Sequence, residues 1–160
     1  MKLLITGGTI DKEYNPITGK LELSASQIIG ALSQGGCHVN FDIEQVFLED
    51  SLDISDAQRE EILNHVLNGN DDQILITHGT DTMVNTAQLL SLYVSDKTIV
   101  LTGSMIPYKV VNSDALFNLG AAIVGVQCLP PGVHICMHGK IFEHNKVSKV
   151  SAAGEFHAQT

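Results

Sequence analysis

The chain has 160 residues, of which 44% are hydrophobic and 17% are charged, and its formal net charge is −9 at pH 7. This balance predicts one soluble globular domain over residues 1–160 and excludes a disordered chain, while no apolar run approaches the roughly 20 residues of a membrane-spanning helix. Because a phosphate backbone is bound by clustered Lys and Arg, which this acidic chain lacks, no binding to nucleic acid is expected.

Short runs rich in Ile, Val and Leu predict buried strands at residues 2–6, 38–47, 73–77, 98–102 and 132–137. Most of them lack polar alternation, which is typical of parallel strands covered on both faces. Helix-length stretches separate them at residues 25–34, 55–67, 82–93 and 113–126, and Ser55 is placed to cap the second of these. The alternation of strands and helices predicts an α/β domain with a mostly parallel sheet.

The segments outside these elements predict a loop, a tail and the location of the protein in the cell. Residues 11–19 are polar and contain Pro16 and Gly19, which predicts a loop, and residues 151–160 have a weak pattern, which predicts a flexible tail. The N-terminal segment has one positive charge and a three-residue apolar run, too short for a secretory signal. The three cysteines have no CxxC spacing and are interpreted as free thiols. A cytoplasmic location is therefore expected.

Three turns rich in glycine and threonine follow predicted strands: Thr6-Gly7-Gly8-Thr9-Ile10, Thr77-His78-Gly79-Thr80-Asp81-Thr82 and Thr102-Gly103-Ser104-Met105. The carboxyl ends of parallel strands meet at one edge of the sheet, where functional groups gather. Glycines let backbone amides approach a ligand, so this edge could bind a carboxylate or stabilise an oxyanion. The alternative is a set of plain strand-to-helix connections with threonine caps. Neither GxxxxGK[ST] nor GxGxxG occurs, which disfavours a phosphate loop and a dinucleotide fold.

Two histidine patterns allow further interpretations. His78, inside the second turn, is expected to orient that turn by hydrogen bonding, with a role as general base as the minor alternative. His134, Cys136 and His138 recur at period two, but a metal site is disfavoured because such sites draw ligands from more than one element.

The first two turns resemble the two signatures of the bacterial-type L-asparaginases, in particular the amino-terminal catalytic domain of those enzymes. The segments Leu101-Thr102-Gly103-Ser104-Met105-Ile106-Pro107, Ser113-Asp114 and Asn118-Leu119 are similar to a further family segment and the helix after it, and the resemblance extends to about Lys149. It implies a three-layer α/β fold and hydrolysis of L-asparagine to L-aspartate and ammonia. It implies no cofactor and no metal.

The resemblance also implies catalytic residues. Thr9 matches the threonine that attacks the side-chain amide carbon, and Thr80 and Asp81 match an active-site threonine and the aspartate that binds the substrate's α-amino group. Lys149 matches the lysine that pairs with both of them and is expected to relay protons. Tyr14 is the candidate for the family's loop tyrosine, which assists the nucleophile from a mobile lid; the alternative is a solvent-exposed loop residue.

Substrate binding is expected to involve a second group of residues. Ser51 falls where the family has a serine that holds the substrate's α-carboxylate. The backbone amides at Gly8–Thr9 and Gly79–Thr80 are the expected oxyanion donors, and Ser104 in the third turn is expected to contact the substrate. The chain departs from the family pattern at Leu52, which stands where a glutamine helps to hold the α-amino group.

The family's carboxy-terminal domain, which supplies an acidic residue to a neighbouring subunit's site, has no counterpart in the sequence, and a natural short-chain form is expected rather than a fragment. A homo-oligomer is expected as well, with a dimer as the commonest symmetric solution. The alternatives in function are a glutaminase or other small-amide hydrolase, a non-catalytic aspartate-binding module, and a subunit that works only with a partner chain.

Overall fold

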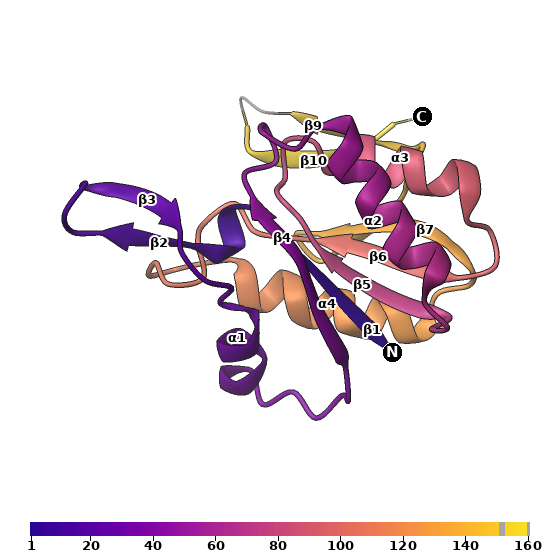
Figure 1. The fold of residues 1–160 in the computed structure, drawn as a ribbon, viewed down its shortest axis with the longest axis horizontal. Coiled ribbons are helices and arrows are strands. Elements are labelled where there is room, and N and C mark those ends of the chain that lie inside the picture. The colour runs from indigo at the N-terminus through magenta and orange to yellow at the C-terminus, as the bar shows by residue number, and fades with distance from the viewer. Residues whose placement is uncertain (151–152, 160) are drawn as a thin grey trace.

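The computed structural model describes residues 1–150 and 153–159, and a six-stranded sheet lies at its centre (Figure 1). The strands follow the order β4-β1-β5-β6-β7-β8. All neighbours in it are parallel except β8, which runs antiparallel to β7. The strands are β1 (Lys2–Gly7), β4 (Asp42–Glu49), β5 (Gln73–Thr77), β6 (Thr98–Thr102), β7 (Gly132–Met137) and β8 (Lys140–Glu143).

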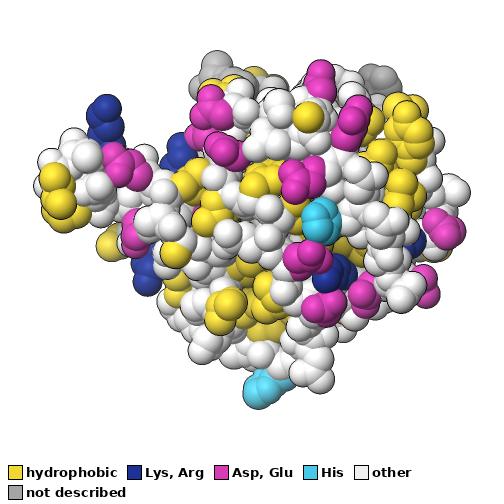
Figure 2. Space-filling view, viewed as in Figure 1, with side chains coloured by type: hydrophobic (Ala, Val, Ile, Leu, Met, Phe, Trp, Pro, Cys, Tyr) yellow, Lys and Arg dark blue, Asp and Glu magenta, His cyan; other side chains and the backbone are white. Residues whose placement is uncertain are grey.

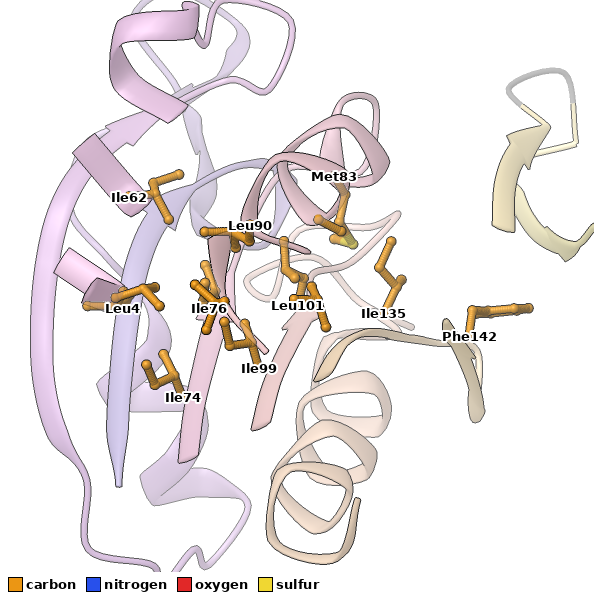
Figure 3. Packing of buried hydrophobic residues seen from close by; sticks show 14 of the residues in the cluster. Leu4, Ile62, Ile74, Ile76, Met83, Leu90, Ile99, Leu101, Ile135 and Phe142 are labelled. Atoms are coloured by element: carbon orange, nitrogen blue, oxygen red, sulfur yellow. The ribbon is translucent and has the colours of Figure 1, made fainter. Parts of the chain in front are cut away.

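Helices cover both faces of the sheet, and side-chain alternation along the strands assigns each face its own core. Leu3 and Ile5 pack with α1 (Ile28–Gln34) and α4 (Ala115–Cys128), whereas Leu4 packs with α2 (Asp56–Asn68) and α3 (Met83–Tyr93). Figure 3 shows the second of these cores, between β1, β5, β6 and the two helices above them. The predicted three-layer α/β fold with a mostly parallel sheet is confirmed. Among the described residues, no helix is long and apolar enough to span a membrane.

The predicted elements agree with the structure except at some ends. Ser55 caps α2 as expected, through a capping box in which its side chain accepts from the backbone of Gln58 and the Gln58 side chain accepts from the backbone of Ser55. The strand predicted at 38–47 begins later, at Asp42, because its partner β1 begins at Lys2, which pairs with Asp42. A strand needs a neighbour for its backbone hydrogen bonds, and residues 38–41 extend beyond β1.

The loop predicted at residues 11–19 is wrong for much of that segment. A short 3₁₀ helix, η1 (Thr9–Asp11), leads into a hairpin of β2 (Lys12–Asn15) and β3 (Lys20–Leu23) that projects from the body of the molecule (Figure 1). The Asn15 side chain accepts from the backbone of Ile17 at 2.9 Å and so closes the turn. Because the hairpin is solvated on both sides, it lacks the apolar run that marks the central strands.

A flexible tail is predicted at residues 151–160, and within this segment residues 155–158 form β10 (Glu155–Ala158) against β9 (Val147–Val150). Residues 151, 152 and 160 lie outside the described residues. Phe156 is only 2% exposed and belongs to the core to which α2 and α3 contribute. One large apolar residue is too weak a pattern to predict a strand, but its burial fastens the hairpin that carries Lys149.

Replacing Phe156 by Ala is expected to lower the free energy of unfolding by about 3–5 kcal/mol, because the change leaves a cavity where a buried ring had packed. Urea denaturation followed by circular dichroism measures this loss. The matched control is His157→Ala, an exposed neighbour on β10, for which a change within about 0.5 kcal/mol is expected. A loss of under about 1 kcal/mol for Phe156→Ala would show that β10 contributes little to the fold.

Candidate active site

The candidate site lies where the strand order of the sheet changes direction. Numbered by their order in the chain, the five parallel strands lie side by side as 2-1-3-4-5. The chain therefore moves from β1 toward one edge of the sheet and from β5 toward the other. Ligands of open α/β sheets bind in the crevice at the carboxyl ends of the strands beside this switch point. The first two glycine–threonine turns follow β1 and β5, which places both turns at that crevice.

Two glycines let the three segments of the site pack against one another. Gly8 has a φ of 85°, and a Cβ atom there would lie 2.4 Å from the backbone nitrogen of Gly79. A Cβ atom on Gly79 would lie 2.5 Å from the Cβ atom of Ser51. Neither position can accept a side chain, so glycine is required at both. This contact brings the segment that carries Thr9 together with those that carry Ser51 and Thr80.

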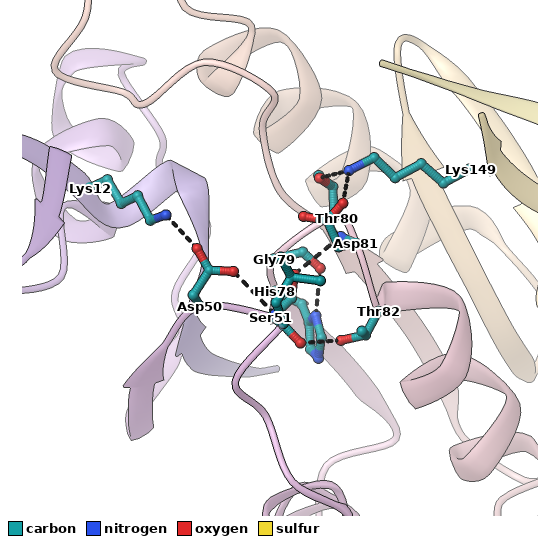
Figure 4. Close-up of polar contacts among 10 residues, drawn as sticks. Lys12, Asp50, Ser51, His78, Gly79, Thr80, Asp81, Thr82 and Lys149 are labelled. Carbon is teal, nitrogen blue, oxygen red and sulfur yellow. Dashed lines mark hydrogen bonds and ion pairs between the residues drawn. The ribbon is translucent and has the colours of Figure 1, made fainter. Parts of the chain in front are cut away.

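A lysine, a threonine and an aspartate form the centre of the site (Figure 4). The Nζ atom of Lys149 donates to Thr80 Oγ1 at 2.8 Å and to Asp81 Oδ1 at 2.6 Å. Thr80 is buried and the Lys149 side chain nearly so, whereas Asp81 is partly exposed. Lys149 reaches the turn from β9, so the structure brings these three predicted residues together, while their catalytic role stays a prediction.

Ser51 holds the same turn in place through two hydrogen bonds. Its hydroxyl oxygen accepts from the backbone amide of Asp81 at 3.1 Å, and its carbonyl oxygen accepts from the Thr82 hydroxyl at 2.7 Å. Ser51 is almost completely buried. These two bonds fix the start of α3 against the end of β4, and they leave the second lone pair and the proton of the Ser51 hydroxyl for a ligand.

The expected oxyanion donors are reduced by one. The amide of Gly8 donates to the carbonyl oxygen of Glu49 at 2.8 Å and is therefore committed to the fold. The amides of Thr9 and of Gly79–Thr80 remain as the proposed oxyanion donors. Thr9 itself is half-buried and begins η1.

The structure does not bring two other predicted residues into the cluster. Tyr14 is 62% exposed on the projecting hairpin, opposite Leu21, and the hairpin lies away from β9 (Figure 1). A catalytic role for Tyr14 stays a prediction that requires the hairpin to fold over the site. Ser104 is buried, and its hydroxyl donates to the carbonyl oxygen of Ile106 at 2.6 Å, so its role here is to close the third turn.

His78 orients the second turn from inside the protein. Its ring is completely buried, with Nδ1 2.8 Å from the carbonyl oxygen of Gly79 and Nε2 2.9 Å from the hydroxyl of Thr86. Because a carbonyl can only accept, Nδ1 carries the proton and Nε2 accepts from Thr86. Burial lowers the pKa of His78 to about 4, against a smaller opposing effect of the bond to Gly79. A buried neutral ring is out of reach of a substrate, which removes the alternative of a general base.

Sequence reasoning missed the role of Asp114, although Ser113-Asp114 was part of the resemblance. The Asp114 carboxylate accepts from the amides of Met105 and Ile106 at 3.0 and 2.9 Å and from the Asn118 side chain at 2.7 Å. Asn118 in turn accepts from the amide of His138 at 2.9 Å. This network fixes the ends of β6 and β7 beside the site.

Two charged residues that follow Thr9 were also missed. The Lys12 ammonium group forms an ion pair with Asp50, next to Ser51 (Figure 4). Asp11 is completely buried and accepts from the amide of Gln27 at 2.7 Å, which ties together the two ends of the hairpin. Burial raises the pKa of Asp11, and its hydrogen bonds offset part of that effect. No local pattern predicts either contact, because both join segments distant in the chain.

The fold and the site together define an α/β domain with a threonine–aspartate–lysine cluster at the switch point of its sheet. The family described as "Asparaginase, N-terminal" matches residues 1–158, and the chain belongs to the asparaginase family.

Curated relatives include the L-asparaginase of Thermococcus kodakarensis, 35% identical over 96% of this chain and 49% of its own length. A glutamyl-tRNA(Gln) amidotransferase subunit of Aeropyrum pernix is 32% identical over 84% of this chain and 34% of its own length. The glutaminase-asparaginase of Acinetobacter glutaminasificans is 32% identical over 92% of this chain and 48% of its own length. The chain thus spans between about a third and a half of these relatives.

Solved structures show the same fold. The thermostable L-asparaginase from Thermococcus kodakarensis superposes with a TM-score of 0.84 at 33% identity, over 99% of this chain and 51% of that one. A probable cytoplasmic L-asparaginase from Campylobacter jejuni superposes with a TM-score of 0.78 at 29% identity, over 98% of this chain and 50% of that one. The expected family and its fold are confirmed.

The depressed pKa of His78 predicts a loss of stability in acid. The pKa falls from about 6.5 in the unfolded chain to about 4 in the folded one, so between these values the unfolded chain binds more protons. The free energy of unfolding should therefore be highest above about pH 6.5 and fall by up to about 3 kcal/mol as the pH approaches 4.

Urea denaturation of the protein and of His78→Gln at several pH values tests this prediction. The variant should be less stable at neutral pH, because it loses two buried hydrogen bonds, and its stability should depend less on pH over this range. The same slope against pH in both proteins would contradict a buried neutral His78.

Proposed function

We propose that this domain hydrolyses L-asparagine to L-aspartate and ammonia, with Thr9 as the nucleophile. The observation that carries the proposal is the Lys149 ammonium group, which hydrogen-bonds to both Thr80 and Asp81 beside the turn that follows β1. Membership in the asparaginase family supports the same reaction class.

In the proposed reaction the hydroxyl oxygen of Thr9 attacks the carbon of the side-chain amide. A threonine hydroxyl is a weak nucleophile at neutral pH, so its proton must pass to a base. The proposed path follows the hydrogen bonds of the cluster, from the Thr80 hydroxyl to Lys149, which gives one of its own protons to the Asp81 carboxylate as it accepts one. The amides of Thr9 and of Gly79–Thr80 stabilise the oxyanion of the tetrahedral intermediate. The C–N bond then breaks as the proton returns along the same path to the nitrogen, which leaves as ammonia, and the product is an ester on Thr9.

Water completes the cycle by hydrolysing that ester, which releases L-aspartate and restores the hydroxyl of Thr9. Asp81 is also the proposed partner of the substrate's α-amino group, because its carboxylate is partly exposed. Ser51 is the proposed contact of the α-carboxylate, and Tyr14 assists Thr9 when the hairpin folds over the site. The reaction consumes one water molecule and moves no electrons, so the proposal includes neither a cofactor nor a metal.

The relatives favour a second candidate, an amidase with another substrate or with a partner chain. One relative is named a glutaminase-asparaginase and another an amidotransferase subunit. Ammonia release from L-glutamine in competition with L-asparagine separates the first possibility from the proposal. Activity that appears only when a second chain is added would support an amidase that requires a partner chain. Binding of L-aspartate without turnover would support a non-catalytic module.

Location and assembly complete the proposal. A structural neighbour is titled a probable cytoplasmic L-asparaginase, which supports a cytoplasmic location for this chain. We propose a homo-oligomer, with a dimer as the simplest closed arrangement. Light scattering coupled to size-exclusion chromatography measures the number of subunits.

Replacing Thr9 by Ala is expected to lower kcat/KM for L-asparagine by at least about 1000-fold, because no other group at the site carries the nucleophilic oxygen. An ammonia-release assay over a wide range of concentrations measures the loss. Thr9→Ser is the matched control, since it retains a hydroxyl and should keep part of the activity. Full activity of Thr9→Ala would remove the basis of the proposal.

Replacing Lys149 by Met is expected to lower kcat by about 100- to 10,000-fold, in the range of other proton-transfer groups. The control on the same hairpin is Lys146→Met, whose side chain is 61% exposed and whose ion pair with Glu143 contributes little. Thermal unfolding of both variants separates lost chemistry from lost stability. Unchanged kcat in a folded Lys149→Met protein would contradict the proposed relay.

A further inference from the structure

A second ion pair faces the site from the side opposite Lys149. Lys12 of β2 and Asp50, which follows β4, lie on one side of the turn at Gly79, and Lys149 lies on the other (Figure 4). Neither Lys12 nor Asp50 takes part in the proposed relay. Their position beside Ser51 raises the question of what this pair contributes.

The backbone places Lys12 one turn after the proposed nucleophile. The amide of Lys12 donates to the carbonyl oxygen of Thr9, which closes one turn of the 3₁₀ helix η1. Lys12 is the extended residue at which η1 ends, three residues after Thr9. Its ammonium group reaches the end of β4, where it contacts Asp50 beside Ser51 (Figure 4).

Asp50 holds that ammonium group in place. One carboxylate oxygen of Asp50 contacts Lys12, and the other accepts from the amide of Leu52 at 3.1 Å. Burial by itself would raise the pKa of Asp50, but the bonds from Lys12 and Leu52 and the nearby charge of Lys149 hold it below its ordinary value. An ammonium group has three donors, and the contact with Asp50 uses one of them.

On a protein with this negative net charge, a local cation favours the binding of a carboxylate group. The net charge is −9, and acidic side chains are spread over the face shown in Figure 2. The long-range field of such a surface repels a carboxylate. Lys149 is 9% exposed and already bonded to Thr80 and Asp81, whereas the Lys12 side chain is 23% exposed. Lys12 is thus the more accessible of the two cations beside this turn.

We propose that Lys12 binds the carboxylate of the substrate, and that Asp50 is the residue that positions Lys12 for this contact. The inference rests on the proposed function and adds Lys12 to Ser51 as a contact of the α-carboxylate, so that amides without a carboxylate close to the cleaved amide are poorer substrates. L-Asparagine has such a carboxylate, and amides of the same length without one, such as β-alaninamide, do not.

A purely structural role for the pair makes a different prediction. If the ion pair only fastens the foot of the hairpin to the end of β4, its loss disturbs every substrate to the same extent. If Lys12 binds a carboxylate, its loss affects only substrates that have one. A comparison of two substrates that differ in this one group therefore separates the two roles.

The test compares L-asparagine with β-alaninamide, in which hydrogen replaces the α-carboxylate and a single amide remains. In Lys12→Gln, kcat/KM for L-asparagine should fall by about 10- to 100-fold, mainly through KM, as for a lost hydrogen bond to a charged group. The value for β-alaninamide should change by less than about threefold. Lys12→Arg should retain most of the preference for L-asparagine, because it retains the charge, and Asp50→Asn should lose part of it.

The matched control is Lys20→Gln, which removes one positive charge from an exposed position on the same hairpin and should leave both substrates unaffected. Equal losses on the two substrates in Lys12→Gln would overturn the inference. The inference would also be overturned if the ratio of kcat/KM for L-asparagine to that for β-alaninamide were the same in Lys12→Gln as in the wild-type protein.

Calorimetric binding of the products keeps the inference separate from the proposed function. L-Aspartate should bind the wild-type protein more tightly than β-alanine does, and Lys12→Gln should reduce that difference by a similar factor. If this holds although no ammonia is released from L-asparagine, the proposed function fails and the carboxylate site stands. If the wild-type protein releases ammonia but binds both products equally, the carboxylate site fails and the proposed function stands.

Discussion

Where β1 and β5 end, the backbone of Gly8 lies against that of Gly79, and Gly79 lies against Ser51, closely enough that a Cβ atom would come within 2.5 Å of its neighbour at both glycines. This contact holds three separate segments of chain at one point. The hydroxyl of Thr9, the amides of the second turn and the start of α3 all take their positions from it. A side chain at either glycine would separate the groups that the proposed chemistry needs together.

Around this contact the charges are arranged in two lysine–aspartate pairs, one from β9 to the second turn and one from β2 to the end of β4. Each lysine lies on a two-stranded hairpin that is separate from the six-stranded sheet. The central sheet therefore supplies the rigid backbone at the switch point, and the two hairpins supply the cations. This division explains why burial of Phe156 in β10, which pairs with Lys149 of β9, bears on the position of that lysine.

The parts of the fold that the sequence predicted are those whose pattern is local. The central strands are buried on both faces and appear as continuous apolar runs, and the capping box at Ser55 lies within four residues. The two hairpins were missed because their strands are short, solvated or dependent on one buried side chain. Each hairpin pairs two strands that follow one another in the chain, but those strands contain too few apolar residues for the sequence pattern to predict them.

By itself, the sequence determined the α/β class, the glycine–threonine turns at the ends of β1, β5 and β6, and the family to which these turns belong. Only the tertiary structure decided that Lys149 meets Thr80 across a separation of 69 residues, that Lys12 meets Asp50 across 38, and that the amide of Gly8 is already bonded to Glu49. The reason is that hydrogen bonds and ion pairs depend on distances in space. Those distances are set by how the sheet packs and where its hairpins fold back, and residue types at known spacings do not specify them.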